Sequence, residues 1–336
     1  MGSSSTPEPP PLDDATLVAL DEVEEGEAIL AQQADTGEVA HEATLGGEEA
    51  GGGRGWATAA WGAPGFAWLG FFLLAPLIFI VLVSFWTRTD IGFSKTWTLD
   101  NYSQLFHDQT YWHNMLTSFE TSLIAVFLCL LIGFPVAYFL ALKVEKMQYQ
   151  IGLFVVALAP FWTSFLTRSV AWTYPLMGRE GALNQVLTKL GVSSLDDPLF
   201  DIGFSTTSVR LAMVQLYVLF MVTPLFFNLS QLDRTALEAA RDLGGNWFST
   251  FRAVILPQIM PGVVIGSIFI FVLTMGEYGT VTVIGGNGVS SVGTIVQSKV
   301  VAIQYPQGAA SAVLLLLALV VGVFVITRFA NLRKEL

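Results

Sequence analysis

The sequence predicts an all-α integral membrane protein with six transmembrane helices and a short amphipathic helix on the cytoplasmic side. Hydrophobic residues make up 53% of the 336 residues and charged residues only 13%, whereas soluble domains carry about 25% charged residues. The mean hydropathy is +0.60. Six apolar stretches are also long enough to cross a bilayer, which takes about 20 residues in a helix. A water-soluble enzyme is therefore excluded.

The first 55 residues differ in composition from the rest of the chain. They contain 13 acidic residues and one basic residue, whereas residues 56–336 are nearly neutral. A segment of low hydrophobicity and high like charge buries too little apolar surface to offset the entropy of ordering. We therefore expect a disordered acidic tail at 1–55 and a transmembrane domain at 56–336. With a net charge of −11, the chain is not expected to bind nucleic acid.

The predicted spans contain almost no charged residues. Arg168 is the single charge in the third span and Glu277 the single charge in the fifth. Buried helices of a soluble protein do not account for six such stretches separated by charged loops. The predicted spans are residues 66–86, 121–142, 151–174, 211–232, 257–284 and 308–327.

The distribution of Lys and Arg predicts the orientation of the chain. Basic residues are concentrated in short cytoplasmic loops of membrane proteins, and acidic residues contribute little to this bias. Here the short loops after the second and fourth spans and the segment after the sixth are dense in basic residues, so we expect both termini in the cytoplasm. The basic residues of these loops are Lys143, Lys146, Arg234, Arg241, Arg252, Arg328, Arg333 and Lys334.

The loop between the fourth and fifth spans, residues 233–256, predicts a short amphipathic helix. Leu232, Ala236, Ala239, Ala240 and Leu243 recur at helical spacing and form one face. A glycine pair, residues 244–245, then ends the helix, where a left-handed residue is cheapest. The small residues suit docking against another protein, but a helix lying on the membrane surface is equally consistent with this spacing.

A family resemblance comes from the same loop. Glu238, Ala239 and Ala240 are followed by three residues, Gly244, nine residues and the run Val254-Ile255-Leu256-Pro257. This pattern resembles the EAA loop of binding-protein-dependent ABC importer permeases, with Val254 where the family pattern has Ile. Further segments between about residues 60 and 334 are similar to the spermidine/putrescine permease group. They are Leu99-Asp100-Asn101-Tyr102, the run 133–141, Arg168-Ser169-Val170-Ala171-Trp172 and Gly276-Glu277-Tyr278.

The resemblance implies a type I ABC importer permease in a bacterial inner membrane. Its expected partners are a second permease subunit, two cytoplasmic ATP-binding subunits, a periplasmic substrate-binding protein and the lipid bilayer. The sequence contains no phosphate-binding loop, so ATP hydrolysis is assigned to the partners; no cofactor or metal is expected. The residues that the resemblance assigns to coupling with the ATPase are Glu238, Ala239, Ala240, Gly244, Leu256 and Pro257.

The expected cargo is a small organic cation such as spermidine or putrescine, and Glu277 is the main candidate for its pathway. A charge inside a span costs about 2.5–3.5 kcal/mol, so it usually faces a cavity or a partner. The ring of Tyr278 beside it would attract a cation, and Trp172 is a further pathway candidate. The structural alternative is that Glu277 pairs with Arg168 to hold the helices together. Glu120, at the edge of a span, is a weaker candidate.

Two other functions remain open from the sequence. The same permease architecture could import a different cargo, such as an anion, iron or another metabolite. A secondary transporter or an intramembrane enzyme is disfavoured, because no internal repeat relates the spans and the intramembrane charges are too few for catalysis.

Overall fold

The computed structural model describes residues 51–89, 92–144, 146–172, 179–194, 198, 204–232 and 234–332. The first helix, α2 (Gly51–Ser84), contains the apolar stretch Ala63–Ser84 that is long enough to span a membrane. The chain divides into two compact units within α2, at Ala75 and Pro76. The predicted acidic tail lies outside the described residues up to residue 50. Residues 51–55 extend α2 instead, because a helix, once nucleated, propagates beyond its apolar stretch.

Four further helices of the described chain are long and apolar enough to cross a membrane: Gln109–Lys143, Thr206–Ser230, Trp247–Met275 and Tyr305–Arg328. They are built from α4 (Gln109–Tyr138) with the π-helix η1 (Phe139–Lys143), α8 (Thr206–Ser230), α11 (Leu256–Met275) with its preceding turns, and α14 (Tyr305–Leu332). Most of each predicted span at 66–86, 121–142, 211–232 and 308–327 is helical in the structure, but the helices begin and end at other residues. The second begins earlier than predicted because Asp108 caps it through the amides of Thr110 and Tyr111.

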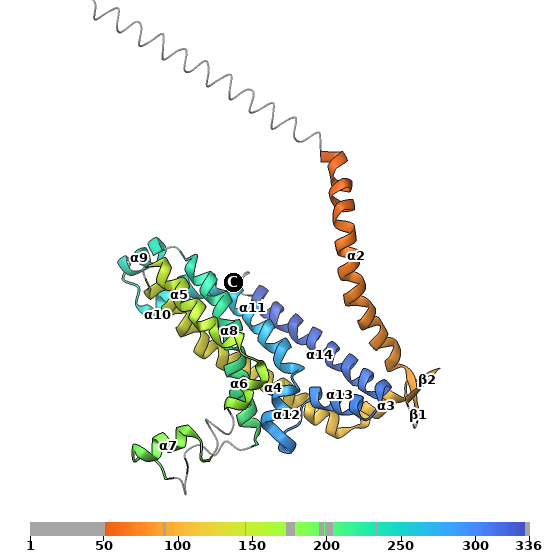
Figure 1. Ribbon diagram of the computed structural model, residues 1–336. Coiled ribbons are helices and arrows are strands. Elements are labelled where there is room, and N and C mark those ends of the chain that lie inside the picture. Colours follow the sequence, from red (N-terminus) through yellow and green to blue (C-terminus); the bar gives the residue numbers. More distant parts are fainter. Residues whose placement is uncertain are drawn as a thin grey trace, which may run out of the picture. The chain divides into compact units, whose positions relative to one another are not determined.

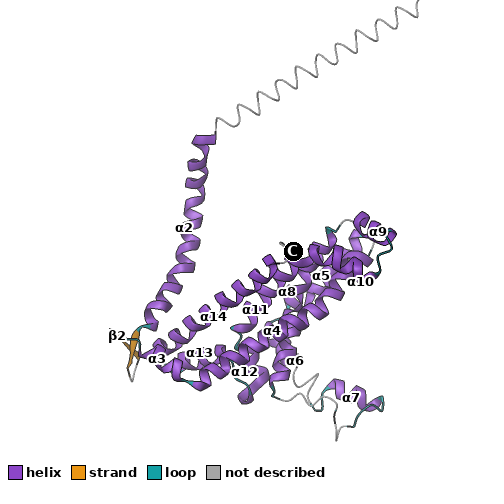
Figure 2. Cartoon of the chain, turned by 180° about the vertical axis from the view of Figure 1, so that it is seen from behind, coloured by secondary structure: helices purple, strands orange, loops and turns teal. Residues whose placement is uncertain are grey.

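The core of the unit from Pro76 to Leu336 is formed by α4, α8 and α11, and α14 packs against α11 (Figures 1 and 2). Its buried side chains include Cys129, Leu216, Met221, Leu225 and Ile270. The backbones of α8 and α11 approach closely at two glycines. A Cβ on Gly262 would lie 2.8 Å from the carbonyl oxygen of Pro224, and one on Gly266 would lie 2.7 Å from Met221 Sδ. Small residues four positions apart allow this contact between membrane helices.

The predicted third span, 151–174, is broken rather than continuous. It consists of α5 (Met147–Leu158), the 3₁₀ turn η2 (Ala159–Trp162) and α6 (Phe165–Trp172), and the two helical parts are bent by 91°. Pro160 stands in the turn and has no amide hydrogen to donate to a preceding carbonyl. The amide and the hydroxyl of Thr163 both donate to the Pro160 carbonyl instead, at 3.2 and 2.7 Å. Counted as one bent span, these two parts bring the number of candidate spans in the described residues from five to six.

The predicted fifth span, 257–284, is also corrected at both ends. It begins within the predicted coupling loop 233–256, because α10 (Trp247–Thr250), the π-helix η4 (Phe251–Ile255) and α11 form one continuous apolar helix. The π turn precedes Pro257, whose ring would clash with an ordinary α-helical turn. The helix stops at Gly276, and α12 (Gly279–Gly285) and the 3₁₀ turn η5 (Gly286–Gly288) follow as separate elements.

A two-stranded antiparallel hairpin, β1 (Trp86–Thr89) and β2 (Gly92–Trp97), follows α2. The hairpin is a local addition to a mostly helical fold, because alternating Thr, Phe and Trp side chains in this loop favour strand pairing. Buried Asn101, on α3 (Asp100–His107), fixes the hairpin by donating to the Ser84 and Trp86 carbonyls, both at 2.9 Å. The remaining described helices are α7 (Ala182–Lys189), α9 (Arg234–Asp242) and α13 (Val292–Val301).

Candidate functional site

The loop between α8 and α11 contains the predicted amphipathic helix as α9, with polar and small residues directed outwards. Glu238 and Ala239 are exposed and Ala240 is half-buried. Of the residues that the spacing places on one face, Ala239 is exposed and Leu243 is 90% exposed, whereas Ala236 and Ala240 are half-buried. Leu237 packs against the core and anchors the helix. The outer surface of α9 is therefore available to a partner.

The end of α9 has the predicted left-handed glycine. Gly244 has φ +77°, and a Cβ placed there meets no atom within 4 Å. The next amide, of Gly245, donates to the Ala240 carbonyl at 3.0 Å. Asn246 then caps α10 by accepting a hydrogen bond from the Ser249 amide at 2.8 Å. Two short helices are thus joined by a turn with defined hydrogen bonds.

Leu256 and Pro257 lie away from the exposed surface of α9. Leu256 is half-buried and packs against the core, whereas Pro257 is exposed. Both stand in the first turn of α11, inside a continuous helix rather than at a hinge. The predicted coupling residues therefore form two groups: Glu238, Ala239, Ala240 and Gly244 around α9, and Leu256 with Pro257 where that loop joins the membrane helix.

Glu277 lies in the break between α11 and α12, where three elements meet. Its carboxylate accepts a hydrogen bond from the Tyr217 hydroxyl of α8 at 2.7 Å and from the Thr280 amide at 2.8 Å. The hydroxyl of Ser291 donates to its backbone carbonyl at 3.0 Å. Gly293 packs so closely that a Cβ there would lie 3.0 Å from the same carbonyl. Glu277 is half-buried, and each carboxylate oxygen retains capacity to accept a further bond.

The other predicted pathway residues are not gathered around this carboxylate. The Tyr278 side chain is 51% exposed, and no described interaction joins its ring to Glu277. The side chain of Trp172 lies outside the described residues. The guanidinium of Arg168 stacks over the Phe161 ring at 5.0 Å, and its buried Nε has no hydrogen-bond partner. Among described residues, Arg168 and Glu277 form no ion pair, so the structural alternative based on that pair is not supported.

Tyr217 is the residue of this site that the sequence did not indicate. It lies in an apolar helix, 7% exposed, and stands 60 residues before Glu277. A buried tyrosine usually directs its hydroxyl to a hydrogen-bond partner, so a polar group nearby could have been expected. Which polar group Tyr217 contacts depends on the packing of α8 against the break after α11, and local sequence patterns do not encode that packing.

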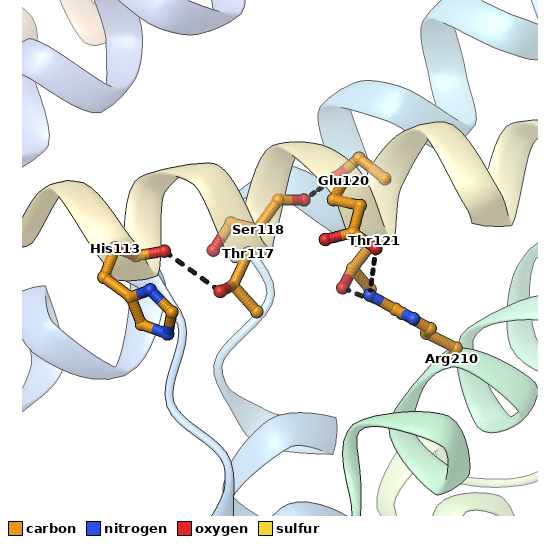
Figure 3. Close-up of polar contacts among 7 residues, drawn as sticks. His113, Thr117, Ser118, Glu120, Thr121 and Arg210 are labelled. Carbon is orange, nitrogen blue, oxygen red and sulfur yellow. Dashed lines mark hydrogen bonds and ion pairs between the residues drawn. The ribbon is translucent and has the colours of Figure 1, made fainter.

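A second carboxylate, Glu120, lies on α4 and faces α8. Its Oε1 accepts from Arg210 Nη2 at 2.8 Å, and Arg210 Nε donates to the Thr121 hydroxyl at 3.4 Å (Figure 3). This is the one ion pair found within the part of the chain that the structure describes. Over the same residues, no group of three His, Cys, Asp or Glu side chains is arranged to hold a metal ion.

Comparison with known proteins identifies the fold and the family. No protein-family model matches the chain. A bacterial ABC transporter that imports the acidic polysaccharide alginate has a chain of similar structure, with a TM-score of 0.56, 16% identity and coverage of 83% of this chain and 96% of that chain. A second structure of a bacterial alginate ABC transporter, in complex with an alginate pentasaccharide-bound periplasmic protein, matches with a TM-score of 0.54, 17% identity and coverage of 83% and 93%.

Curated relatives agree with this fold over nearly their whole length. PotB, a spermidine/putrescine transport system permease protein of Salmonella typhimurium (strain SL1344), is 35% identical over 270 residues, 80% of this chain and 92% of the relative. The PotB proteins of Escherichia coli (strain K12) and Haemophilus influenzae are both 34% identical, over 80% and 78% of this chain and 96% and 90% of the relatives.

The arrangement of spans around α4, α8 and α11, with an exposed helix in the loop before the fifth, defines a multi-pass permease subunit of an ABC importer in the inner membrane. This chain belongs to the PotB family of transport system permeases.

Proposed function

We propose that the chain forms half of the translocation pathway for spermidine, putrescine or a similar small organic cation. The observation that carries this proposal is the 35% identity to PotB over nearly the whole relative. The half-buried carboxylate of Glu277 supports it, because an acidic group inside a membrane bundle suits a cationic cargo. We assign Glu277 to the pathway, with Tyr278 and Trp172 as further lining residues.

The chain acts with partners that supply the energy and the substrate. We expect a second permease subunit, two cytoplasmic ATPase subunits that hydrolyse ATP, and a periplasmic substrate-binding protein. A structurally similar transporter in complex with a periplasmic protein supports the last of these. The exposed surface of α9, with Glu238, Ala239 and Ala240, is the proposed contact with an ATPase subunit. Gly244 lies at the edge of this surface, in the turn that ends α9.

The proposed orientation places both termini and α9 in the cytoplasm. In both views α9 and α10 lie at the same end of the bundle as the C-terminal end of α14 (Figures 1 and 2). The basic residues Lys143, Arg252 and Arg328 belong to this end, as the positive-inside rule requires of a cytoplasmic surface. Leu256 and Pro257 then connect the ATPase contact to the membrane-spanning part of the fifth span.

The experiment that tests this function is reconstitution of the complete importer. The chain is coexpressed with its second permease, ATPase and binding protein, and uptake of radiolabelled spermidine and putrescine into proteoliposomes is measured with and without ATP. We expect ATP-dependent uptake of at least one polyamine, reduced by Glu277→Gln. An assembled complex that hydrolyses ATP but takes up neither polyamine would refute the substrate and favour another cargo. Failure to copurify an ATPase subunit would refute the partners.

A further inference from the structure

An apolar groove lies between α4 and α11, and Ile326 of α14 also lines it. Along α4 the lining extends from Leu123 to Pro135, and along α11 and its preceding turn it extends from Phe251 to Ser267. The groove has a volume of about 640 Å³, within the range of ~300–1,000 Å³ that is typical of ligand sites. Ser267 is the only polar residue among those that line it. The groove therefore suits a hydrocarbon ligand.

The length of the groove fits one leaflet of a bilayer better than a whole membrane span. A rise of about 1.5 Å per residue gives a length of about 18 Å between Leu123 and Pro135. One leaflet contributes half of a hydrocarbon core of about 30 Å, whereas a spanning helix of another subunit would cover all of it. Phe127, within this stretch, is 64% exposed, so the groove is open to the outside of the bundle. Its size and opening favour a lipid acyl chain as the occupant.

One end of the groove carries residues that are typical of a membrane interface. Trp247 is exposed, and its ring stacks on that of Phe251 with 5.3 Å between the centroids. Tryptophan is enriched at the level of the lipid headgroups. Arg252 is exposed and stands one turn before Leu256, which lines the groove. Its guanidinium makes no hydrogen bond or ion pair within the described part of the chain. This end of the bundle also carries α9 and α10 (Figures 1 and 2) and is cytoplasmic in the proposed orientation.

We propose that the groove binds one acyl chain of an anionic phospholipid from the cytoplasmic leaflet and that Arg252 binds its phosphate. A guanidinium recognises a phosphate through two parallel hydrogen bonds, and anionic lipids of the cytoplasmic leaflet attract basic residues at the membrane surface. The acyl chain contacts α4 and α11 at the same time. It therefore stabilises the position of α11, the helix that continues from the loop containing α9. This inference goes beyond the transport function and uses only the proposed orientation.

Native mass spectrometry of the assembled, detergent-purified importer tests the role of Arg252. Phosphatidylglycerol is the probe, and phosphatidylethanolamine, which has no net charge, is the comparison. We expect the wild type to bind phosphatidylglycerol more tightly. Arg252→Gln should weaken this binding by about fivefold, the effect of one basic residue near an anionic membrane surface, and Arg252→Lys should retain most of the affinity.

Arg328 supplies the matched control for charge. It is exposed at the same end of the bundle, but it follows Ile326 by two residues and so stands on the opposite side of α14 from the groove. Arg328→Gln should leave the affinity for phosphatidylglycerol unchanged. An equal loss in Arg252→Gln and Arg328→Gln would show a general attraction to basic residues and would overturn the inference. Equal affinities of the wild type and Arg252→Gln, or of the wild type for the two lipids, would overturn it as well.

A pair of neighbouring substitutions tests the acyl-chain site. Val264 lines the groove, whereas Ile265 is exposed and does not. Val264→Trp should fill the groove and lower the affinity for phosphatidylglycerol by at least as much as Arg252→Gln does, and Ile265→Trp should leave it unchanged. Equal affinities of these two variants would contradict binding in the groove. The Tm of each variant without added lipid is measured alongside, so that a folding defect is recognised.

Photocrosslinking identifies the occupant in the membrane. The photoreactive amino acid p-benzoylphenylalanine replaces Phe127 with little change in shape, and the importer is irradiated in proteoliposomes that contain phosphatidylglycerol. We expect adducts of the chain with phospholipid. Crosslinks to the second permease subunit without any lipid adduct would show that a protein fills the groove and would overturn the inference.

Discussion

Replacement of Gly244 tests the proposed coupling to the ATPase separately from the folding of the chain. The residue has φ +77° at the end of α9, and a Cβ placed there would meet no atom within 4 Å. A larger side chain therefore projects into open space in the isolated subunit. Its effect on the chain itself is limited to the left-handed backbone, whereas at the proposed contact between α9 and an ATPase subunit its effect would be steric.

The backbone cost follows from the conformation. A non-glycine residue in the left-handed region costs about 1–2 kcal/mol, which lowers the population of the ordered turn by roughly 5- to 30-fold relative to its alternatives. Asn tolerates this region better than Ala does. For a residue that serves the turn alone, Gly244→Asn should thus be milder than Gly244→Ala. For a residue at a protein contact, the larger Asn should be at least as harmful.

Gly191 supplies the matched control. It follows α7 with φ +72°, and a Cβ added there would likewise meet no atom within 4 Å, but it lies far along the chain from α9. We expect Gly244→Leu to abolish ATP-driven uptake and binding-protein-stimulated ATPase activity in proteoliposomes. Gly191→Leu should cost the same backbone strain and retain most uptake. The yield of membrane-inserted chain is measured for both variants.

Wild-type uptake by Gly244→Leu would refute the coupling role outright. Equal loss of uptake by Gly191→Leu would also refute the reasoning, because strain alone would then explain the defect.

Three further predictions concern the packing and the polar contacts. Tyr217→Phe removes a hydrogen bond to the Glu277 carboxylate, worth about 1.5–3 kcal/mol, and should raise the apparent KM for polyamine uptake; an unchanged KM would show that Glu277 needs no orientation. Gly266→Leu forces side-chain atoms against Met221 and should destabilise the helix bundle by about 1–3 kcal/mol. The destabilisation is measured as a lower Tm in detergent, and an unaltered Tm would contradict the close helix contact. Asn101→Ala leaves two backbone carbonyls without their donor, so limited proteolysis of the hairpin should accelerate; equal cleavage rates would contradict its anchoring role.

Hydropathy predicted most of the fold because burial in lipid requires long apolar helices. It placed the spans around α4, α8, α11 and α14, and the glycine pair after α9 marked the turn at the end of that helix. It could not place helix ends that depend on a single capping residue. Asp108 is the capping residue that sets the start of α4, and this role is visible only in the structure, where its side chain accepts hydrogen bonds from two backbone amides.

The two breaks inside apolar stretches were harder to predict. Pro160 and Gly276 are both compatible with a continuous membrane helix, since prolines and glycines are tolerated there. Pro135 and Pro261 indeed lie within unbroken helices. Whether such a residue interrupts the helix depends on which neighbouring groups satisfy the freed backbone, as Thr163 does at one break. The contact between Tyr217 and Glu277 likewise arises from tertiary packing and left no local pattern.

The bend in the third span has a consequence for the lifetime of the chain before assembly. Phe161 and Trp162 are exposed at the bend, the latter by 80%, and irregular backbone at membrane depth is tolerated only where protein or water covers it. An orphan subunit would present this defect directly to acyl chains, where a membrane protease could recognise it. We therefore expect the cellular half-life of the chain to lengthen when the proposed partner permease is made, so that excess unassembled copies are removed and subunit stoichiometry is maintained.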